Sequence, residues 1–334
     1  PFRVGDPISI QAYRSLMDLR AAHSLRTPLY KGFTIGLNFR LPPPRQPLSH
    51  PRSTDPLMPT DAVRKAPHPP TEVDMTYILC KPLQTGPEYE SEVWLAQPCQ
   101  PFSPGAPTSQ VVLKFVIPSR LPRPPTELTE GMLHHEFEYT LPGDVLDCEV
   151  RAYEWLQDLQ GSNMPYYYGV HQVTMPWDEV AYVIALEHVS ESLSLSSIQR
   201  CIDPPIADDT NTTECTKYRD FASYVKLFTS ALSALQRAHS WHIHHLDVNG
   251  DNILVDETHD HAVLIDWCNI AHLQVDEGNL GNPYEWARSR DLHLLLHTFA
   301  QCEEHYDNFA QYVRDNHPDF KTHYVPFKPN VYYA

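Results

Sequence analysis

Residues 245–252 of the chain read His-Leu-Asp-Val-Asn-Gly-Asp-Asn, and residues 265–267 read Ile-Asp-Trp. Between these two stretches, short apolar runs at 252–255 and 263–265 flank the polar residues 257–260. Short apolar runs on either side of a polar turn predict a β-hairpin. Such a hairpin brings the residues at the start of its first strand close to those at the end of its second.

Three side chains of this stretch suit phosphoryl transfer: Asp247, Asn252 and Asp266. Magnesium ions prefer oxygen ligands in near-octahedral geometry, with one or two from the protein and the rest from phosphates and water. Asn252 and Asp266, at the ends of adjacent strands, can supply the protein ligands. The separate carboxylate of Asp247 can then orient an acceptor hydroxyl and take its proton. We therefore expect Asp247 to be catalytic and Asn252 and Asp266 to bind the metal.

This pattern resembles the catalytic loop of the protein-kinase-like superfamily, where an Asn follows the Asp of His-x-Asp by five residues and a metal-binding Asp lies on the next strand. Asn249 and Asp251 stand where protein kinases usually carry Lys or Arg, and Trp267-Cys268 replaces Phe-Gly. Ile-Asp-Trp is more similar to the aminoglycoside-phosphotransferase branch and to fungal-type kinase-like domains. The resemblance covers about residues 76–300, and it implies ATP and Mg²⁺ as cofactors.

The superfamily also has a lysine on its third strand and a glutamate on the following helix. Lys114 stands amid five apolar residues at 111–116, where a buried ammonium group needs a counter-charge. Glu149 begins a stretch of helical spacing at 149–159 and is the expected partner, with Glu154 one turn later as the alternative. By resemblance, the pair holds the Lys114 ammonium group against the α- and β-phosphates of ATP.

The same resemblance implies further cofactor-binding residues. At the place of the family's glycine-rich loop, the chain has a single glycine, Gly86, followed by Pro87 and flanked by glutamates. Glycines let backbone amides approach phosphates, so this loop makes a poor anion-binding nest. Glu187 and His188 follow a predicted strand and match the hinge, whose backbone groups hold adenine.

Asp291, within Arg-Asp-Leu-His at 290–293, is similar to the aspartate that braces the family's catalytic loop. His245 is expected to brace that loop as well. His242 and His244 lie on one side of a short predicted strand and suggest zinc, but no carboxylate or thiol completes a ligand set at close spacing. Few residues follow Asp291, which predicts a shortened helical lobe.

The distribution of proline and charge divides the chain. Ten of the 32 prolines fall between residues 41 and 70, and basic residues outnumber acidic ones in this part. Residues 1–75 are therefore predicted to be a flexible, basic, proline-rich arm, with one short helix near residues 10–17. Strand-like runs come next, and a long helical pattern at 221–235 follows; the runs lie at 77–79, 92–96, 111–116 and 183–186.

This order predicts an α+β, two-lobed protein-kinase-like fold. The small β-rich N-lobe is expected at 76–188, with a polar insertion at 118–147. The truncated, helical C-lobe is expected at 189–334.

Composition excludes several classes of protein. Acidic residues outnumber basic ones by 42 to 25, so the surface repels phosphate backbones and anionic lipid, and neither nucleic acid nor a membrane is expected as a partner. No apolar run reaches the roughly 18–20 residues that span a bilayer. Seven cysteines without a Cys-x-x-Cys pair fit free thiols in a reducing compartment. We therefore expect an intracellular, cytoplasmic protein.

Together these features predict an ATP- and Mg²⁺-dependent kinase, a phosphotransferase with a hydroxyl-bearing acceptor. The acceptor is either a protein Ser/Thr or a small molecule. The alternative is a pseudokinase, a nucleotide-binding or scaffolding module without turnover, which the degenerate loop at Gly86 favours. A third possibility is a binding protein whose motifs arose by chance.

Overall fold

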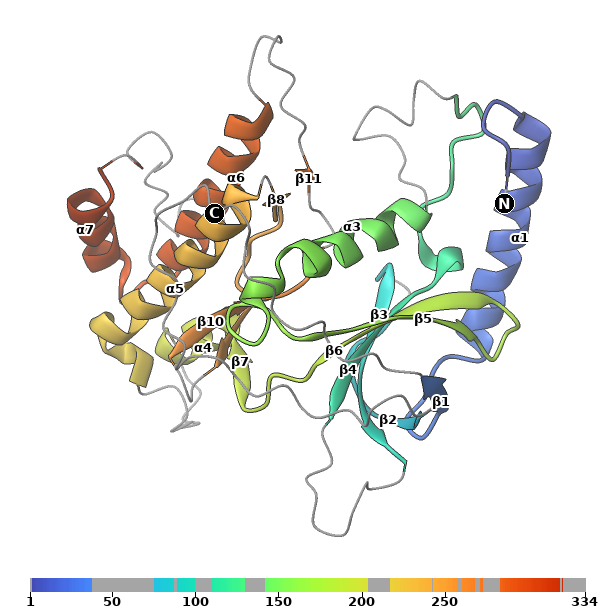
Figure 1. The fold of residues 1–334 in the computed structure, drawn as a ribbon, viewed down its shortest axis with the longest axis horizontal. Helices are drawn as coiled ribbons and strands as arrows, with labels where there is room; N and C mark the ends of the chain where they lie inside the picture. Colours follow the sequence, from blue (N-terminus) through green and yellow to red (C-terminus); the bar gives the residue numbers. More distant parts are fainter. Residues whose placement is uncertain are drawn as a thin grey trace. The chain divides into compact units, whose positions relative to one another are not determined.

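The structure, a computed structural model, divides into two compact units (Figure 1). It describes residues 2–37, 75–86, 89–99, 110–129, 142–203, 217–241, 243–256, 260–267, 271–272, 283–318 and 320. Within these ranges, the first unit takes in the chain up to Val150 and Tyr166–His188, and the second takes in Arg151–Pro165 and the chain from Val189. The chain last passes between the units at His188–Val189.

A six-stranded antiparallel sheet forms the centre of the first unit. Its strands are β1 (Thr34–Leu37), β2 (Met75–Gln84), β3 (Ser91–Pro98), β4 (Val111–Val116), β5 (Tyr167–Thr174) and β6 (Val180–Glu187). They lie in the order β1-β2-β3-β4-β6-β5. The four predicted strands are confirmed as β2, β3, β4 and β6, whereas β1 and β5 had not been predicted.

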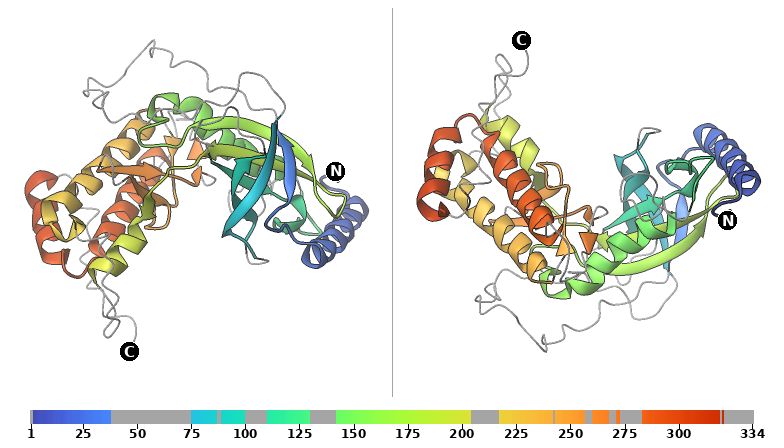
Figure 2. Two further views of the ribbon diagram at one scale, coloured as in Figure 1. Left: turned by 90° about the horizontal axis from the view of Figure 1, so that it is seen from below. Right: turned by 90° about the horizontal axis from the view of Figure 1, so that it is seen from above.

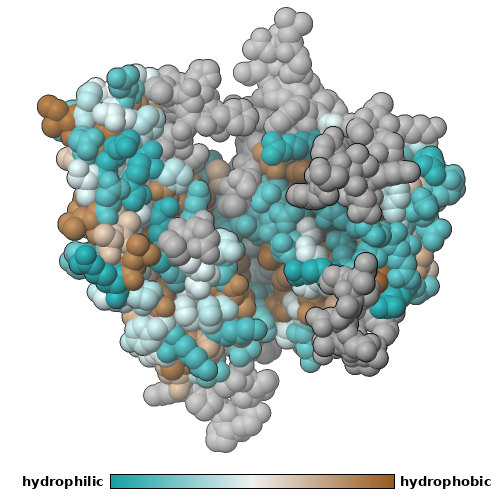
Figure 3. All heavy atoms as spheres, turned by 180° about the vertical axis from the view of Figure 1, so that it is seen from behind, coloured by the Kyte–Doolittle hydropathy of each residue, from teal (hydrophilic) through white to brown (hydrophobic). Residues whose placement is uncertain are grey.

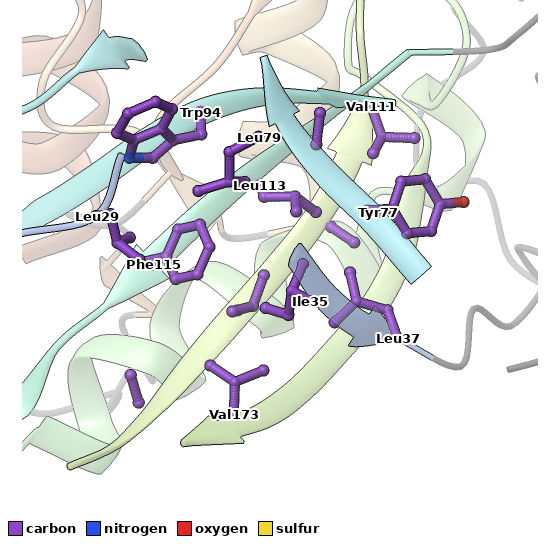
Figure 4. Close-up of a cluster of buried hydrophobic side chains, with 14 of the residues drawn as sticks. Leu29, Ile35, Leu37, Tyr77, Leu79, Trp94, Val111, Leu113, Phe115 and Val173 are labelled. Atoms are coloured by element: carbon purple, nitrogen blue, oxygen red, sulfur yellow. The ribbon is translucent and has the colours of Figure 1, made fainter. Parts of the chain in front are cut away.

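One face of this sheet carries the hydrophobic core of the first unit. Side chains alternate between the two faces of a strand, so Leu113 and Phe115 of β4 lie fully buried in the core and Lys114 points to the opposite face. Figure 4 shows core side chains from β1, β2, β3 and β5 packed around those of β4; they include Ile35, Leu37, Tyr77, Leu79, Trp94 and Val173. The core therefore leaves the lysine on the other side of the sheet.

Residues 2–37 form a helix and a strand, and not the flexible arm predicted for residues 1–75. Helix α1 (Pro7–Arg26) is longer than the short helix predicted near 10–17, and its Ile10 and Met17 are buried. The prediction failed because the proline-rich composition of residues 41–70 was extended to a segment that does not share it. Residues 38–74 lie outside the described residues.

Helix α1 begins where its sequence provides a cap. The carboxylate of Asp6 accepts hydrogen bonds from the backbone amides of Ile8 and Ser9, at 3.1 and 3.2 Å. Pro7 stands in the first turn, where its missing N–H group is not needed.

Two helical elements connect the strands of the first unit to the rest of the chain. The short 3₁₀ helix η2 (Pro118–Arg120) follows β4 directly. Helix α3 (Pro142–Trp155) starts earlier than the helical stretch predicted at 149–159, and its Ala152 and Tyr153 are fully buried. The predicted insertion at 118–147 therefore holds η2 and the first turns of α3, while its residues 130–141 lie outside the described residues.

Helices dominate the second unit: α4 (Leu195–Ile202), α5 (Phe221–Ser240), α6 (Pro283–Ala300) and α7 (Tyr306–Asn316). The long helix predicted at 221–235 is confirmed as α5, and its buried side chains recur with the helical period. The ring of Phe228 on α5 packs edge-on against Phe299 of α6 and Phe309 of α7, with centroids 5.4 and 4.9 Å apart. These three helices thus share one core and lie side by side (Figure 2).

The predicted hairpin is also present in the second unit. Strands β9 (Ile253–Asp256) and β10 (His261–Leu264) pair antiparallel, and β7 (Ser192–Ser194) lies beside β9. Strands β8 (Ile243–His244) and β11 (Ala271–His272) form a second small pair. The α+β class, with a β-rich first unit and a mainly helical second unit, is confirmed.

Hydrophobic side chains are scattered among hydrophilic ones on the face of the protein seen in Figure 3. Scattered apolar side chains of this kind are ordinary on protein surfaces. Among the described residues, no helix combines the length and the apolar character that crossing a membrane requires.

Candidate active site

The predicted ion pair of the first unit is present. The ammonium nitrogen of Lys114 lies 2.8 Å from Oε2 of Glu149, and the two side chains are 11% and 2% exposed. The alternative partner, Glu154, is exposed on the same helix. Burial makes either charge costly without the other, so strand β4 and helix α3 are tied together through this pair.

Apolar side chains surround Lys114 on its face of the sheet; Ile184, opposite it on β6, is fully buried, and two others are half-buried. Val93 of β3 stands directly opposite Lys114 in the strand pairing, and Val112 lies two residues before it on β4. Neither valine is fully buried, in contrast to the side chains on the core face. This face therefore offers an apolar surface beside a paired ammonium group, which suits a planar base with attached phosphates.

The predicted hinge residues lie at the end of β6. The amide of Glu187 donates to the carbonyl of Tyr166 at 2.8 Å, and Oε2 of Glu187 accepts from the amide of Tyr166 at 3.0 Å. Because this amide is used inside the first unit, a base at the hinge would contact the Glu187 carbonyl or the backbone of His188. Burial, and then the charge of Lys81, lower the pKa of His188 below its usual value.

Gly86 lies in the turn between β2 and β3, with a φ of 141° that side-chain-bearing residues rarely adopt. Its carbonyl accepts a hydrogen bond from a guanidinium nitrogen of Arg120 at 3.2 Å and one from the amide of Tyr89 at 3.4 Å. Residues 87 and 88 lie outside the described residues. The single glycine thus provides the turn itself.

Two amide side chains hold the carboxylate of Asp247. Asn249 Nδ2 lies 3.3 Å from Oδ1, and Asn252 Nδ2 lies 3.1 Å from Oδ2. Both amides also donate to the Asp247 carbonyl, at 3.2 and 3.0 Å. Neutral donors on both oxygens fix the direction of this half-buried carboxylate.

Asn249 also shapes the loop that carries these residues. Its side-chain oxygen accepts from the amides of Asp251 and Asn252, at 2.9 and 3.1 Å, which closes a tight turn. Gly250 lies against the start of α4, where a Cβ atom would be 2.4 Å from Oγ of Ser196. From the sequence, Asn249 was noted only as a departure from Lys. The Asn-Gly pair at 249–250 is a turn signal, and it could have predicted that Asn249 shapes the loop.

Asn252 and Asp266 stand at the open end of the β9–β10 hairpin. The amide of Ile265 donates to the carbonyl of Asn252 at 3.0 Å, which extends the strand pairing by one position. Asp266 follows Ile265 directly and has a φ of 62°, an uncommon backbone conformation of the kind that clusters at functional sites. An amide and a carboxylate on neighbouring strands provide the oxygen atoms that Mg²⁺ prefers, so the residues fit the ion.

The loop that carries Asp247 is braced by Asp291, as predicted. One oxygen of this fully buried carboxylate accepts from the amide of Leu246 at 2.7 Å, and the other from the amide of His245 and from Nε2 of His239, at 2.9 and 2.8 Å. Leu246 has a φ of 64°, which these bonds hold in place. Burial raises the pKa of Asp291, but the bond and the charge of His239, the charge of His245 and the Leu246 amide outweigh it and leave the pKa below its usual value.

His245 braces the loop from its other side. Its Nε2 lies 2.9 Å from the carbonyl oxygen of Ile265, and its ring centroid lies 4.6 Å from that of Trp267. This histidine, two residues before Asp247, thus joins the loop to the strand end that carries Asp266.

One group of described residues has the composition of a metal site: His239, His244 and Asp291, with ligand atoms within 4.8 Å of one another. Of the two histidines that were considered for zinc and set aside, His244 belongs to this group and His242 lies outside the described residues. Both Asp291 oxygens already accept short hydrogen bonds, from the loop that carries Asp247 and from His239. We therefore assign this group to bracing the loop.

Comparisons with known proteins found matches among solved structures. No protein-family model and no curated protein matches the sequence. Among solved structures, the kinase PK-1 of Cydia pomonella granulovirus is similar, with a TM-score of 0.42 and 15% sequence identity over 68% of this chain and 70% of that one.

Proposed function

We propose that the chain is an ATP- and Mg²⁺-dependent phosphotransferase with a protein-kinase-like fold, which transfers the γ-phosphate of ATP to a hydroxyl group. One observation carries the proposal: the carboxylate of Asp247 is held by two amides in a loop that buried Asp291 fixes. Asn252 and Asp266, which fit a magnesium ion, lie at the end of the same hairpin.

The magnesium ion supplies charge neutralisation for the phosphates of ATP. Asn252 and Asp266 would hold it through their side-chain oxygens. Because Nδ2 of Asn252 donates to Asp247, the oxygen of the same carboxamide points the other way. One asparagine thus links the orientation of the base to the metal site.

Asp247 acts on the acceptor. Its carboxylate accepts a hydrogen bond from the acceptor hydroxyl and takes the proton as the oxygen attacks the γ-phosphorus. A bond forms between the acceptor oxygen and the γ-phosphorus, and the bond from that phosphorus to the oxygen bridging the β-phosphate breaks. The electron pair stays on the departing ADP.

The residues of the first unit bind ATP in this proposal. Lys114, fixed by Glu149, contacts the α- and β-phosphates, and the half-buried valines on its face of the sheet contact the base. Glu187 and His188 contribute backbone groups to adenine, and the turn at Gly86 lies over the phosphates.

The acceptor is proposed to carry a hydroxyl on a small molecule or on a protein Ser/Thr. Asn249 and Asp251 stand where protein kinases carry Lys or Arg, so the loop lacks the cation that accompanies a peptide acceptor in that family. This absence favours a small-molecule acceptor.

The test is ADP release by the wild-type chain and by Asp247→Ala, with Mg²⁺ and a panel of serine peptides and small polyols. Loss of the proton acceptor is expected to lower turnover by about 10²–10⁴-fold. Asp251→Asn is the matched control, because this exposed carboxylate lies in the same loop and is expected to leave turnover within about twofold. Equal turnover by wild type and Asp247→Ala removes the assignment.

A pseudokinase is the second candidate, and the turn at Gly86 favours it. The carbonyl of this single glycine faces Arg120, and no further glycine stands beside it to open backbone amides to phosphates. Thermal unfolding separates the two candidates: an active kinase is stabilised more by ATP with Mg²⁺ than by ATP alone. No shift with either favours a scaffold.

A further inference from the structure

Arg120 joins the two ends of the turn that contains Gly86. It is the last residue of η2, directly after the strand that carries Lys114, and its side chain is 7% exposed. One guanidinium nitrogen pairs with Oε1 of Glu92 near the start of β3, and another donates to the carbonyl of Gly86 after β2, at 3.2 Å. The planar fork of arginine allows both contacts at once.

This contact lies on the face of the sheet opposite Lys114. Glu92 stands opposite Phe115 in the strand pairing, and its Oε2 accepts from the indole nitrogen of core residue Trp94 at 2.8 Å. Side chains alternate along a strand, so Arg120 reaches the turn from the core face while Lys114 occupies the other face.

The residue before Arg120 is fixed by a buried carboxylate. Glu179, which is fully buried, accepts from the amide and the hydroxyl of Ser119 at 2.9 and 2.6 Å. Arg123 donates to the carbonyl of Ser119 at 2.8 Å and pairs with Asp18 of α1 at 3.0 Å. The position of the Arg120 backbone is thus set from Glu179, directly before β6, and from the N-terminal helix.

A turn over phosphates has to hold its shape, and several glycines usually form it as an anion-binding nest. This chain has one. We propose that Arg120 is a positioning residue that fixes the turn at Gly86 from behind, in place of a glycine nest, and so sets the affinity for the phosphates of ATP. The proposal rests on the proposed function, because the turn acts on ATP only if the chain binds ATP.

The test is Arg120→Lys, a change that keeps the charge opposite Glu92 but removes the fork that also reaches Gly86. The KM for ATP is expected to rise about tenfold, the size of one hydrogen bond to a charged group, with kcat within about twofold. Hydrogen exchange measured without nucleotide on the peptide spanning 81–92 is expected to be about tenfold faster in the variant. Arg237→Lys is the control, because Arg237 pairs with Asp158 of the second unit at 2.5 Å and is far from this turn in the sequence.

The outcomes separate this inference from the proposed function. A wild-type KM together with wild-type exchange in Arg120→Lys overturns the inference, as does a loss in kcat at unchanged KM. Faster exchange combined with no ATP binding by wild type or variant overturns the proposed function and keeps Arg120 as the brace of the turn. Thermal unfolding of Arg120→Lys within a few degrees of wild type shows that the fold is retained.

Discussion

The two faces of the first unit's sheet each carry a buried ion pair, and the pairs differ in their surroundings. Lys114–Glu149 lies beside half-buried valines, with side chains 11% and 2% exposed. Arg120–Glu92 lies on the core face, with side chains 7% and 3% exposed. Glu92 also accepts a hydrogen bond from Trp94, and Arg120 donates one to the carbonyl of Gly86. In our proposals, similar charge chemistry therefore serves two ends: one pair presents a cation to phosphates, and the other fixes a turn.

The difference teaches how to separate function from stability in such pairs. A buried pair is weak evidence of stabilisation, because its attraction has to offset the desolvation of both charges. The Arg120–Glu92 pair shows that such a pair can also hold other polar groups of the fold. Arg120 and Glu92 each serve a second hydrogen bond of the fold, so removing this pair leaves other polar groups unsatisfied.

Of the changes that break one of these two pairs, the largest expected effect is on turnover, in the double variant Lys114→Met/Glu149→Leu. Removing both charges avoids an uncompensated buried ion, so the free energy of unfolding in urea is expected to stay at or above that of wild type. ADP release is expected to fall by about 10²–10³-fold, because a preorganised cation for the phosphates is lost.

The matched control on the other face is Arg120→Met/Glu92→Leu. Here the indole nitrogen of Trp94 loses its acceptor, so the free energy of unfolding is expected to drop by about 1–3 kcal/mol. Its kcat is expected to stay within about threefold of wild type. The opposite pattern, a stable inactive Arg120 variant and an unstable active Lys114 variant, reverses the roles assigned to the two faces.

Asp291 of the second unit is a third buried charge, and backbone amides hold it in place of an arginine or lysine. Asp291→Asn places an NH₂ group against the donors of His239, His245 or Leu246, so the free energy of unfolding is expected to fall by about 2–4 kcal/mol at pH 7. Because kcat depends on the loop that these bonds fix, it is expected to fall as well.

The pH dependence gives this variant a second readout. The folded state lowers the pKa of Asp291 below the ordinary 3.8, so its stabilisation is complete above pH 3.8 and is lost as pH falls through the folded-state value. The stability difference between wild type and Asp291→Asn is therefore expected to shrink below pH 3.8. A difference that stays constant there contradicts the assigned cause.

How far the sequence predicts which residues lie together depends on how local each contact is. Asp247 and Asn252 lie in one loop, and Asp266 is joined to them by a single hairpin, so spacing and turn chemistry were enough to predict that the three lie near one another. The pairing of Lys114 with Glu149 crosses from a strand to a helix, and the resemblance to a known family was needed to choose Glu149 over Glu154.

The missed features have physical reasons as well. Strand β5 carries a register shift after Tyr167 and a Gly169 with a φ of 105°, which interrupt the alternation that marks a strand. Arg120 looks like one polar residue of a proline-containing loop, and only the path of η2 across the core face brings it to Gly86. Contacts made by a loop with distant strands leave no periodic signal.

The smallest expected effect concerns Glu179, whose carboxylate holds Ser119, the residue before Arg120. Glu179→Gln keeps one acceptor oxygen but turns an NH₂ group toward the donors of Ser119 and Trp177, whose indole nitrogen lies 2.7 Å from Oε2. The free energy of unfolding in urea is expected to fall by about 1–2 kcal/mol. Ser119→Ala, which removes one donor and leaves the carboxylate its other two bonds, is expected to cost less. The contrary result is a Glu179→Gln variant that is as stable as wild type but has a raised KM for ATP. Glu179 would then affect ATP binding without stabilising η2, and the core face of the sheet would not be purely structural.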